Sequence, residues 1–546
     1  MTPQHTESTP VLIVGGSVVG LTAALCLAFH NVPVILIERH PGSSLSHPRA
    51  IGYTSRTMEI YRAFGIDHDK IPQVPPDFKL RRARVESLAG TWYEESEWME
   101  KKMMEEEKSS FSFLDFSPSL GGVIAQDKLE DILRETALQR GGVDLRYQNT
   151  LVDFEHDDDG ITALVRNDKD GQEYTLRASY LIAADGHRSP VREKLGIQRA
   201  GRGHMQTTNS VLFRARPSID EYLQRGVSQF SIDQQDFKAF LTSYRDGRWV
   251  LMFPDDDDVD RDEETLKSLI YRAVGRSDLD VEIITTGRWE MTALIAEKFQ
   301  SGRIFLMGDA AHTLPPNRGG YGANTGIADA HNLAWKLAAV LSGVSMPELL
   351  ETYDHERRPV AWLRHQQIFA RADFKAYLGD NVKLSDEVID DIAMELGQRY
   401  RSKAVLLGAD DDMLPPALRP DQWAGQPGTR AAHFWLTKPD GKKISSLDLF
   451  PRCWVLLSES AEWKAAAVQA SQESGIHVEP VHVGVDVQLD DDVAVFLQAM
   501  GISAPGGASL VRPDGYIAWR ATELSSDPLA TVNDVLRQVA FARRLS

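Results

Sequence analysis

A glycine-rich turn between an apolar strand and an apolar helix is the feature that most restricts how this chain folds. The turn is Gly15-Gly16-Ser17-Val18-Val19-Gly20; an apolar strand is expected over Pro10–Gly15 and an apolar helix over Ser17–His30. A second apolar strand is expected over Val32–Ile37. Short apolar runs of this kind are typical of strands buried on both faces, so the βαβ unit predicts a parallel sheet.

The same turn has the sequence context that dinucleotide binding requires. Backbone N–H groups in a tight strand-to-helix turn can approach a pyrophosphate at the positive end of the helix. Glu38 ends the second strand, where a carboxylate can accept hydrogen bonds from both hydroxyls of an adenosine ribose. Ser17 replaces the usual middle glycine and slightly narrows the approach. A plain glycine turn in an ordinary α/β domain remains the alternative, while Val19 stands where a hydrolase nucleophile elbow needs glycine.

A second polar constellation follows two further buried strands. The strands are expected over Tyr180–Ala184, which leads into Asp185-Gly186, and over Arg303–Met307, which leads into Gly308-Asp309. Acids at the carboxyl ends of strands in an open α/β sheet face the ligand crevice, so Asp309 is expected to share the crevice of Gly15. The glycine-rich loop from Pro315 to Thr325 then leads into a helix expected over Gly326–Leu341, whose free N–H groups favour negative charge.

Other segments predict an inserted sheet and a separate C-terminal part. Residues 77–119 and 202–289 are rich in aromatic and β-branched residues, and they are expected to form one sheet. Its clearest hairpin joins Phe240–Tyr244 to Trp249–Phe253, with Asp246-Gly247 supplying positive φ angles. A helix is expected over Gln126–Leu133 and another over Met346–Gln367, with a break near Pro359. The proline-rich stretch 408–427 predicts a linker to a compact α/β domain.

Composition excludes several classes of partner. Asp and Glu number 79 against 60 Lys and Arg, a net charge of −19, so nucleic acid and anionic membrane surfaces are not expected as partners. Two cysteines, Cys26 and Cys453, exclude a disulfide framework, and no His or Cys spacing predicts a metal site. No signal peptide and no apolar run of about 18 residues is present, so a cytoplasmic location is expected.

Five motifs together resemble the single-component FAD-dependent aromatic hydroxylases of the para-hydroxybenzoate hydroxylase type. They are the Gly15 turn with Glu38-Arg39, the segment from Pro48-Arg49 to Glu59, Gln126 to Glu130, Ala184-Asp185-Gly186, and Gly308 to His312. The long C-terminal extension, with Val511 to Trp519, is similar to the phenol hydroxylase and aromatic-polyketide hydroxylase branch, which includes the aklavinone and angucycline hydroxylases. The combination is highly specific and covers about 400 residues well.

This resemblance implies an α/β fold in three parts. A Rossmann-like FAD-binding domain would comprise residues 1–76, 120–201 and 290–407. An inserted, mainly antiparallel β-sheet substrate domain would comprise 77–119 and 202–289. After the linker, residues 428–546 would form a thioredoxin-like α/β domain. That domain has no Cys-x-x-Cys, so a packing or dimer-contact role is expected rather than redox activity, and a homodimer is one option.

The resemblance also implies the cofactor contacts. The FAD pyrophosphate would be held from Gly15 to Gly20, including Gly16, Ser17 and Val18, with the adenosine ribose at Glu38 and the adenine near Arg39. Arg49 and Gln126 would contact the pyrophosphate and ribityl region, and Asp185 would contact flavin and NADPH. Asp309 would bind the ribityl hydroxyls, and backbone at Gly322, Ala323 and Asn324 would face the flavin N1 and C2 carbonyl.

The implied chemistry is oxygenation of an aromatic ring. NADPH would reduce non-covalently bound FAD, molecular oxygen would add at flavin C4a, and the resulting hydroperoxide would hydroxylate a phenolic or polyketide-type substrate. The inserted sheet would roof the substrate, and five of its aromatic residues could line an apolar pocket: Phe230, Phe240, Tyr244, Trp249 and Phe253. No motif marks the residue that deprotonates the substrate.

Three alternatives stay open at this point. Baeyer–Villiger oxygen insertion into a polycyclic ketone uses the same scaffold, and the motifs do not separate it from hydroxylation. A flavin-free nucleotide-binding module is the second alternative, because Ser17 departs from the glycine pattern. A plain nicotinamide dehydrogenase is the third, and Asp309 with its glycine-rich loop argues against it.

Overall fold

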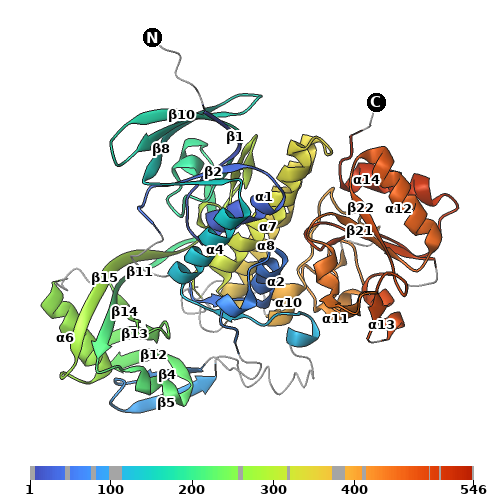
Figure 1. The fold of residues 1–546 in the computed structure, drawn as a ribbon. Coiled ribbons are helices and arrows are strands. Elements are labelled where there is room, and N and C mark those ends of the chain that lie inside the picture. Colours follow the sequence, from blue (N-terminus) through green and yellow to red (C-terminus); the bar gives the residue numbers. More distant parts are fainter. Residues whose placement is uncertain are drawn as a thin grey trace, which may run out of the picture.

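The fold was analysed in a computed structural model. It describes residues 7–42, 50–74, 81–97, 113–255, 262–316, 320–371, 388–408, 413–490, 492–502 and 506–543. Figure 1 shows three parts: a mainly parallel sheet with its helices at the top and centre, an inserted sheet at the lower left, and a C-terminal unit at the right. The α/β architecture expected from the sequence is confirmed.

The parallel sheet has the strand order β16-β17-β10-β1-β2-β7. The expected βαβ unit is present as β1, helix α1 and β2, and β1 pairs in parallel with both β2 and β10. The hairpin of β8 and β9 extends the sheet by antiparallel pairing with β10. The bounds are Gln300–Ser301 for β16, Ile304–Leu306 for β17, Glu173–Ala183 for β10, Glu7–Val14 for β1, Val34–Glu38 for β2, Val143–Tyr147 for β7, Asn149–His156 for β8 and Ile161–Asn167 for β9.

Helix α1 (Val18–Phe29) packs between α4 (Gln126–Arg140) and α7 (Tyr321–Leu341). Helix α7 begins five residues before Gly326, where its start was expected. The reason is packing: a Cβ at Gly326 would lie 2.6 Å from Val19 Cγ2, so glycine is required there by a close neighbour and not by a helix end. Helix α2 (Ser55–Ala63) lies beside α7, and the short strands β3 (Gly52–Tyr53) and β6 (Gly122–Val123) pair nearby.

The break expected near Pro359 is wrong, because helix α8 (Thr352–Ala370) runs through this residue. Proline leaves the carbonyl four residues earlier without a helical hydrogen bond. That carbonyl belongs to His355, and both His355 and Pro359 are exposed, so water can satisfy it. The short helix α10 (Asp391–Leu396) follows. Among the described residues, no helix combines the length and apolar character needed to cross a bilayer.

The inserted sheet has the order β18-β15-β11-β14-β13-β12-β4-β5. Parallel pairing of β4 with β12 joins the two expected segments into one sheet, as predicted. Helix α6 (Glu263–Val274) covers one face. The strands are His312–Thr313 for β18, Asp280–Ala296 for β15, Arg199–Arg216 for β11, Trp249–Pro254 for β14, Phe237–Ser243 for β13, Val227–Gln234 for β12, Arg81–Val85 for β4 and Trp92–Glu97 for β5.

The hairpin between β13 and β14 differs in its turn from the expectation. Positive φ angles occur at Arg245 (60°) and Gly247 (80°), not at Asp246. The Tyr244 N–H donates to the Arg248 carbonyl at 3.0 Å, which closes a three-residue loop. Asp246 instead uses its carboxylate, which accepts hydrogen bonds from the backbone and guanidinium of Arg248.

The C-terminal unit, residues 428–543, contains a four-stranded sheet of order β22-β21-β24-β25, with α12 and α14 packed together. Strand β21 is parallel to β22 and antiparallel to β24, the arrangement of a thioredoxin-like core. Within the stretch expected to be a linker, α11 (Pro420–Trp423) forms and Trp423 is buried. The bounds are Val478–His482 for β22, Trp454–Ser458 for β21, Ala508–Val511 for β24, Ile517–Ala521 for β25, Ala461–Ser474 for α12, Val493–Ala499 for α13 and Pro528–Val539 for α14.

Candidate functional site

Four strands of the parallel sheet end at one edge, and this brings the predicted polar residues together. Leu306, Ala183, Val14 and Ile37 lie in register on β17, β10, β1 and β2. Glu38, the Gly15 turn, Asp185 and Asp309 each follow within three residues of this row. Three strand spacings of about 4.8 Å place Glu38 and Asp309 at the two ends of a site about 14 Å wide.

The turn after β1 is held by contacts that admit only glycine. Gly15 has a φ of 107°, and a Cβ there would lie 2.3 Å from the Ala184 carbonyl oxygen. A Cβ at Gly20 would lie 1.9 Å from the Gly15 oxygen, so the first turn of α1 packs directly on the loop. The Gly16 N–H donates to Glu38 Oε2 at 2.7 Å, which couples the turn to the end of β2.

Ser17, which departs from the glycine pattern, directs its hydroxyl to helix α4. Ser17 Oγ donates to Glu130 Oε1 at 2.6 Å and accepts from Gln126 Nε2 at 2.9 Å. The same Glu130 oxygen accepts the Val18 N–H at 3.1 Å and so caps α1. Gln126 therefore lies at the turn, and its contact with the cofactor stays a prediction. Glu130 was not singled out as a site residue, although it follows Gln126 by one helical turn on α4.

Glu38 is positioned to bind hydroxyl groups. Its Oε1 accepts hydrogen bonds from the N–H (2.9 Å) and the Nδ1 (2.6 Å) of His40, while Oε2 binds Gly16. The His40 side chain is 64% exposed, so a ribose hydroxyl can replace it. Arg39 is exposed beside this position. Arg49, the other predicted basic contact, lies outside the described residues.

Asp185 carries a buried acceptor that the protein leaves unpaired. Its Oδ2 accepts the Val191 N–H at 3.2 Å, and its Oδ1 is buried without a hydrogen-bond partner among the described residues. Burial raises the pKa of this carboxyl, partly offset by hydrogen bonds from Ser189 and Val191. Unpaired buried acceptors are costly, so a donor on a bound molecule is expected here.

The turn that carries Asp309 is fixed by a buried acid. Gly308 has a φ of 57°, and its N–H donates to Asp329 Oδ2 at 3.2 Å. Asp329 is fully buried and also binds His312 Nε2 and Arg357 Nε, each at 2.7 Å. Burial would raise the pKa of Asp329, but the charges of Arg357 and His312 hold it below its usual range. Asp309 itself is half-buried.

The start of α7 lies against this turn. Val19, in the first turn of α1, is close to both Gly308 and Gly326, so α1, α7 and the Asp309 turn meet. Gly320 has a φ of 57° and precedes the helix, and helix geometry leaves the first N–H groups, including those of Gly322 and Ala323, without partners within the helix.

Asn324 locks this helix start to the segment before α2. Its Oδ1 accepts hydrogen bonds from the Thr54 N–H at 3.0 Å and from Thr57 Oγ1 at 2.6 Å. Its Nδ2 donates to the Gly320 carbonyl at 2.9 Å. The Asn324 side chain therefore has a structural role. Its backbone follows those of Gly322 and Ala323, the other two residues whose backbone is predicted to face the flavin.

The five aromatic residues of the inserted sheet divide between its two faces. Phe230, Trp249 and Phe253 are buried with α6 in the core of the outer face. Phe240 and Tyr244 lie at positions whose side chains point to the opposite face, because side chains alternate along a strand. Tyr244 packs against Ala125, which directly precedes α4. Only these two aromatics are therefore placed on the face toward the parallel sheet.

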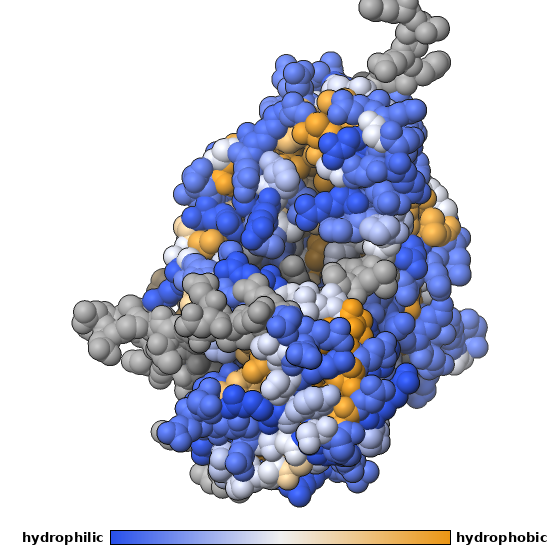
Figure 2. Space-filling model, turned by 90° about the vertical axis from the view of Figure 1, so that its left-hand side faces the viewer, coloured by the Kyte–Doolittle hydropathy of each residue, from blue (hydrophilic) through white to orange (hydrophobic). Residues whose placement is uncertain are grey.

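An ion pair joins this face to α4. Arg248 donates to both oxygens of Asp127, at 2.8 and 3.1 Å, and both residues are largely buried. Asp127 directly follows Gln126, so the sheet is anchored beside the predicted cofactor contact. Figure 2 shows that the molecular surface is hollowed at mid-height, between the part with β8 and β10 and the inserted sheet.

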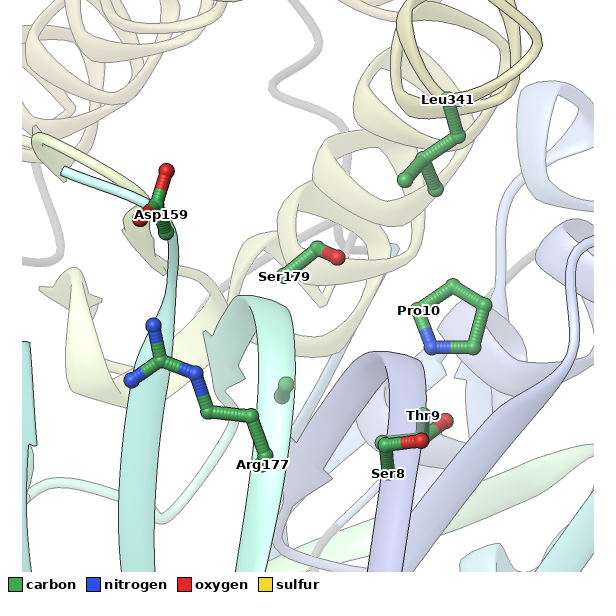
Figure 3. Close-up of a pocket in the computed structure, with 8 residues that line it drawn as sticks. Ser8, Thr9, Pro10, Asp159, Arg177, Ser179 and Leu341 are labelled. Carbon is green, nitrogen blue, oxygen red and sulfur yellow. The ribbon is translucent and has the colours of Figure 1, made fainter.

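A cavity of about 300 Å³ lies elsewhere. Ser8, Thr9 and Pro10 of β1, Arg177 to Ser179 of β10, Asp159 and Leu341 line it, and Figure 3 shows their side chains around it. Ser8 to Pro10 lie near the amino-terminal end of β1, and Arg177 to Ser179 lie beside them in the middle of β10, away from the carboxyl ends that lead to Glu38 and Asp309. The cavity is separate from the candidate site.

The residues at the carboxyl edge fit an extended dinucleotide such as FAD. The close-packed glycine turn and the starts of α1 and α7 lie at this edge, where the helix dipoles favour anionic groups, although the Gly16 and Val18 N–H groups already bind Glu38 and Glu130. Glu38 and Asp309 supply acceptors for sugar or ribityl hydroxyls at the two ends, and the unpaired Oδ1 of Asp185 lies between them.

Comparisons with known proteins show the family of this chain. The family described as FAD binding domain matches residues 8–367, and the family described as aromatic-ring hydroxylase, C-terminal, matches residues 424–540. A 4-methyl-5-nitrocatechol 5-monooxygenase from Burkholderia sp is 38% identical over 562 residues, covering 98% of each chain. An aklavinone 12-hydroxylase from Streptomyces purpurascens is 37% identical, covering 97% of this chain and 98% of the relative.

A solved structure extends the likeness to the whole fold. The crystal structure of a ternary complex of aklavinone-11 hydroxylase with FAD and aklavinone matches with a TM-score of 0.84 and 34% identity, and it covers 99% of each chain. The flavin-free module and the plain dehydrogenase are not supported by these relatives. The chain therefore belongs to the FAD-dependent aromatic-ring hydroxylases, as its motifs predicted, and is a flavoprotein monooxygenase.

Proposed function

We propose that this monooxygenase uses NADPH and molecular oxygen to hydroxylate a phenolic ring of a polycyclic, polyketide-type substrate. The observation that supports the proposal most is the single row of strand ends that brings Glu38, Gly15 and Asp309 to one edge of the parallel sheet. Relatives named for aklavinone support the substrate class, and a relative named for a nitrocatechol supports the phenolic ring.

We propose the following residues as the FAD-binding set. The pyrophosphate is assigned to the Gly15 turn, the adenosine end to Glu38 and Arg39, and the ribityl end to Asp309. The full set is Gly15, Gly16, Ser17, Val18, Gly20, Glu38, Arg39, Arg49, Gln126, Asp185, Asp309, Gly322, Ala323 and Asn324. Bound FAD would accept hydride from NADPH and would activate oxygen at its C4a atom.

The protein's own groups would bind, orient and exclude water. N–H groups at Gly322 and Ala323, with the dipole of α7, favour negative charge at the flavin pyrimidine. The inserted sheet, tied to α4 by Arg248 and Asp127, covers the substrate and limits access of water. Of the five predicted aromatics, Tyr244 and Phe240 lie on the face of the sheet opposite to α6.

Hydroxylation is favoured over Baeyer–Villiger oxygen insertion by the names of the relatives, which are hydroxylases and a catechol monooxygenase. Product analysis separates the two reactions. With ¹⁸O₂, hydroxylation places one labelled oxygen in a new phenol, whereas oxygen insertion places it in a lactone.

The direct test begins with purified protein reconstituted with FAD. Phenols, catechols and tetracyclic polyketides are screened for stimulation of NADPH oxidation, with NADH as the comparison, and products are analysed by mass. We expect a gain of one oxygen from a polycyclic phenol. Failure to bind FAD, or NADPH oxidation without any oxygenated product across the panel, would contradict the proposal.

A further inference from the structure

A buried ion pair lies directly behind the start of α7. Arg364 on α8 and Glu395 on α10 are 3% and 6% exposed, and Arg364 Nη2 lies 3.3 Å from Glu395 Oε2. Arg364 Nη1 donates to Thr325 Oγ1 at 3.1 Å, and its guanidinium lies 4.7 Å from the centroid of the Tyr321 ring. Both Tyr321 and Thr325 belong to the beginning of α7.

Each partner keeps one polar atom unsatisfied. Arg364 Nε and Glu395 Oε1 are buried without a hydrogen-bond partner among the described residues. Buried polar groups are normally paired, and Glu395 Oε1 is an atom of this cluster that can accept a proton. Burial raises the pKa of the Glu395 carboxyl, offset by the charge of Arg364 and a hydrogen bond from Thr54. This carboxyl can therefore gain a proton more readily than an exposed one.

The charges around Glu395 can be counted element by element. Arg364 approaches from α8 and Arg371 from the position directly after that helix, and Arg371 pairs with Asp391 of α10. Tyr321 is the titratable group from α7, and no acidic residue lies in the first turn of that helix. With Glu395 ionised, two positive and two negative charges cancel. With Glu395 protonated, the cluster carries one positive charge at the helix start.

We propose that Arg364 and Glu395 adjust the reduction of bound FAD: Glu395 takes up one proton from solvent when reduction makes the flavin anionic, and this leaves the charge of Arg364 uncancelled. The inference rests on the proposed function, because it needs the flavin pyrimidine at the start of α7. Hydride from NADPH brings two electrons and one proton to FAD and releases NADP⁺. The second proton goes to the Glu395 carboxylate, so reduction consumes one proton more than the hydride brings.

The wild-type holoenzyme provides the first test. Its two-electron midpoint potential is measured by stepwise reduction with dithionite between pH 5 and pH 9. We expect two protons per two electrons at pH values where the Glu395→Gln holoenzyme takes up one, so that protonation of the reduced flavin itself is not counted. One proton per two electrons at every pH would overturn the inference.

Two variants give a second, independent test. In Glu395→Gln, which is isosteric and cannot ionise, we expect one proton per two electrons throughout and, at pH 9, a reduction equilibrium at least tenfold more favourable than in the wild type, about 30 mV. The double variant Glu395→Gln with Arg364→Met also removes the positive charge, so its potential should lie below that of Glu395→Gln at every pH. Equal potentials in these two variants would contradict a charge effect.

Asp390→Asn is the matched control. Asp390 precedes α10 and caps it through the Ala393 N–H, a role that Asn fulfils equally well. The midpoint potential of Asp390→Asn should equal that of the wild type at each pH. A shift as large as that of Glu395→Gln would mean that removal of any acidic charge near α10 changes the potential, and it would overturn the assignment to Glu395. Absence of FAD from the wild type would instead contradict the proposed function. If the wild type binds FAD but Glu395→Gln takes up the same number of protons per two electrons as the wild type, this inference is contradicted and the proposed function is not.

Discussion

Asp329 holds the peptide of Gly308: the Gly308 N–H donates to Asp329 Oδ2 at 3.2 Å. The other oxygen of Asp329 binds Arg357, which also donates to the carbonyl of Thr325 at 3.1 Å. One buried carboxylate therefore fixes the turn that carries Asp309 relative to the beginning of α7. The distance between the predicted ribityl contact and the predicted pyrimidine contacts is thus set by protein contacts before any cofactor binds, which reduces the ordering cost of binding.

Asp309→Ala should yield largely cofactor-free protein. A hydrogen bond to a charged group contributes about 1.5–3 kcal/mol, so the Kd for FAD should rise about 10- to 100-fold. The measurement is the flavin absorbance per protein after purification and after titration of the apoprotein with FAD. Asp309→Asn, which keeps one acceptor oxygen, serves as the intermediate case. Full retention of FAD by the alanine variant would show that this carboxylate does not bind the cofactor.

Gly15→Ala should damage the turn itself. The added Cβ would lie 2.3 Å from the Ala184 oxygen, in a backbone conformation with a φ of 107°. We expect a loss of at least about 2 kcal/mol in the free energy of unfolding, together with weaker FAD binding. Gly42→Ala is the control, because among the described residues no atom lies within 4 Å of a Cβ built there. Urea denaturation of both variants checks the prediction, and equal midpoints would argue against a steric requirement at Gly15.

The local parts of this site were predictable from the sequence. Apolar runs and a glycine turn define β1, α1 and β2 within about 30 residues, and Gly308-Asp309 follows its strand directly. These signals depend on neighbours along the chain, so no knowledge of the fold is needed to interpret them.

The partners that hold the site were not predictable in this way. Ser17 and Glu130 are 113 positions apart, and Asp329 and Arg357 are 28 apart. Nothing local distinguishes such residues from ordinary helix positions. The apolar stripe that follows the glycine-rich loop predicts a helix from Gly326, whereas the helix begins at Tyr321 and Gly326 is in close contact with Val19. This contact between helices has no local signal in the sequence.

Arg512→Met should destabilise the junction between the C-terminal unit and α8. Arg512 donates to both oxygens of Glu356, at 2.6 and 2.9 Å, and both side chains are fully buried. Arg512 also pairs with the buried Asp514, while Glu356 keeps Lys336 as a partner, so removal of Arg512 leaves one uncompensated negative charge in this buried cluster and costs about 3–5 kcal/mol. Thermal or urea unfolding measures this loss.

The pair Arg62 and Asp448 is the matched control for Arg512. It also joins α2 to the C-terminal unit with a 2.8 Å contact, but its side chains are 30% and 25% exposed. Arg62→Met should therefore cost about 1 kcal/mol or less. If both methionine variants lose the same stability, burial of the Arg512 pair is not the reason for its contribution.

Arg248→Met should loosen the inserted sheet from α4. Arg248 is the link to Asp127, and its loss leaves that carboxylate buried and unpaired beside Gln126. FAD should remain bound, while NADPH oxidation becomes less coupled to product and hydrogen peroxide is released, because water reaches the site more easily. The ratio of product to NADPH consumed is the measurement. If this variant still forms one product molecule for each NADPH consumed, the ion pair does not hold the inserted sheet over the site.

Acidification should remove the contribution of Asp329 only at low pH. The pKa of Asp329 is held below its usual range in the folded protein, so the charged form of this carboxyl stabilises the fold. The stabilisation is complete at pH values above the unfolded pKa of about 3.9. It is lost as the pH falls through the pKa of the folded state. Asp329→Asn breaks the pair with Arg357 and should cost about 3–5 kcal/mol at pH 7. The difference in urea midpoint between wild type and variant should stay constant from pH 8 to pH 5 and narrow below about pH 4. A difference that already vanishes at pH 6 would mean that another group controls it, and His312, which faces the same carboxylate, would be the first to replace.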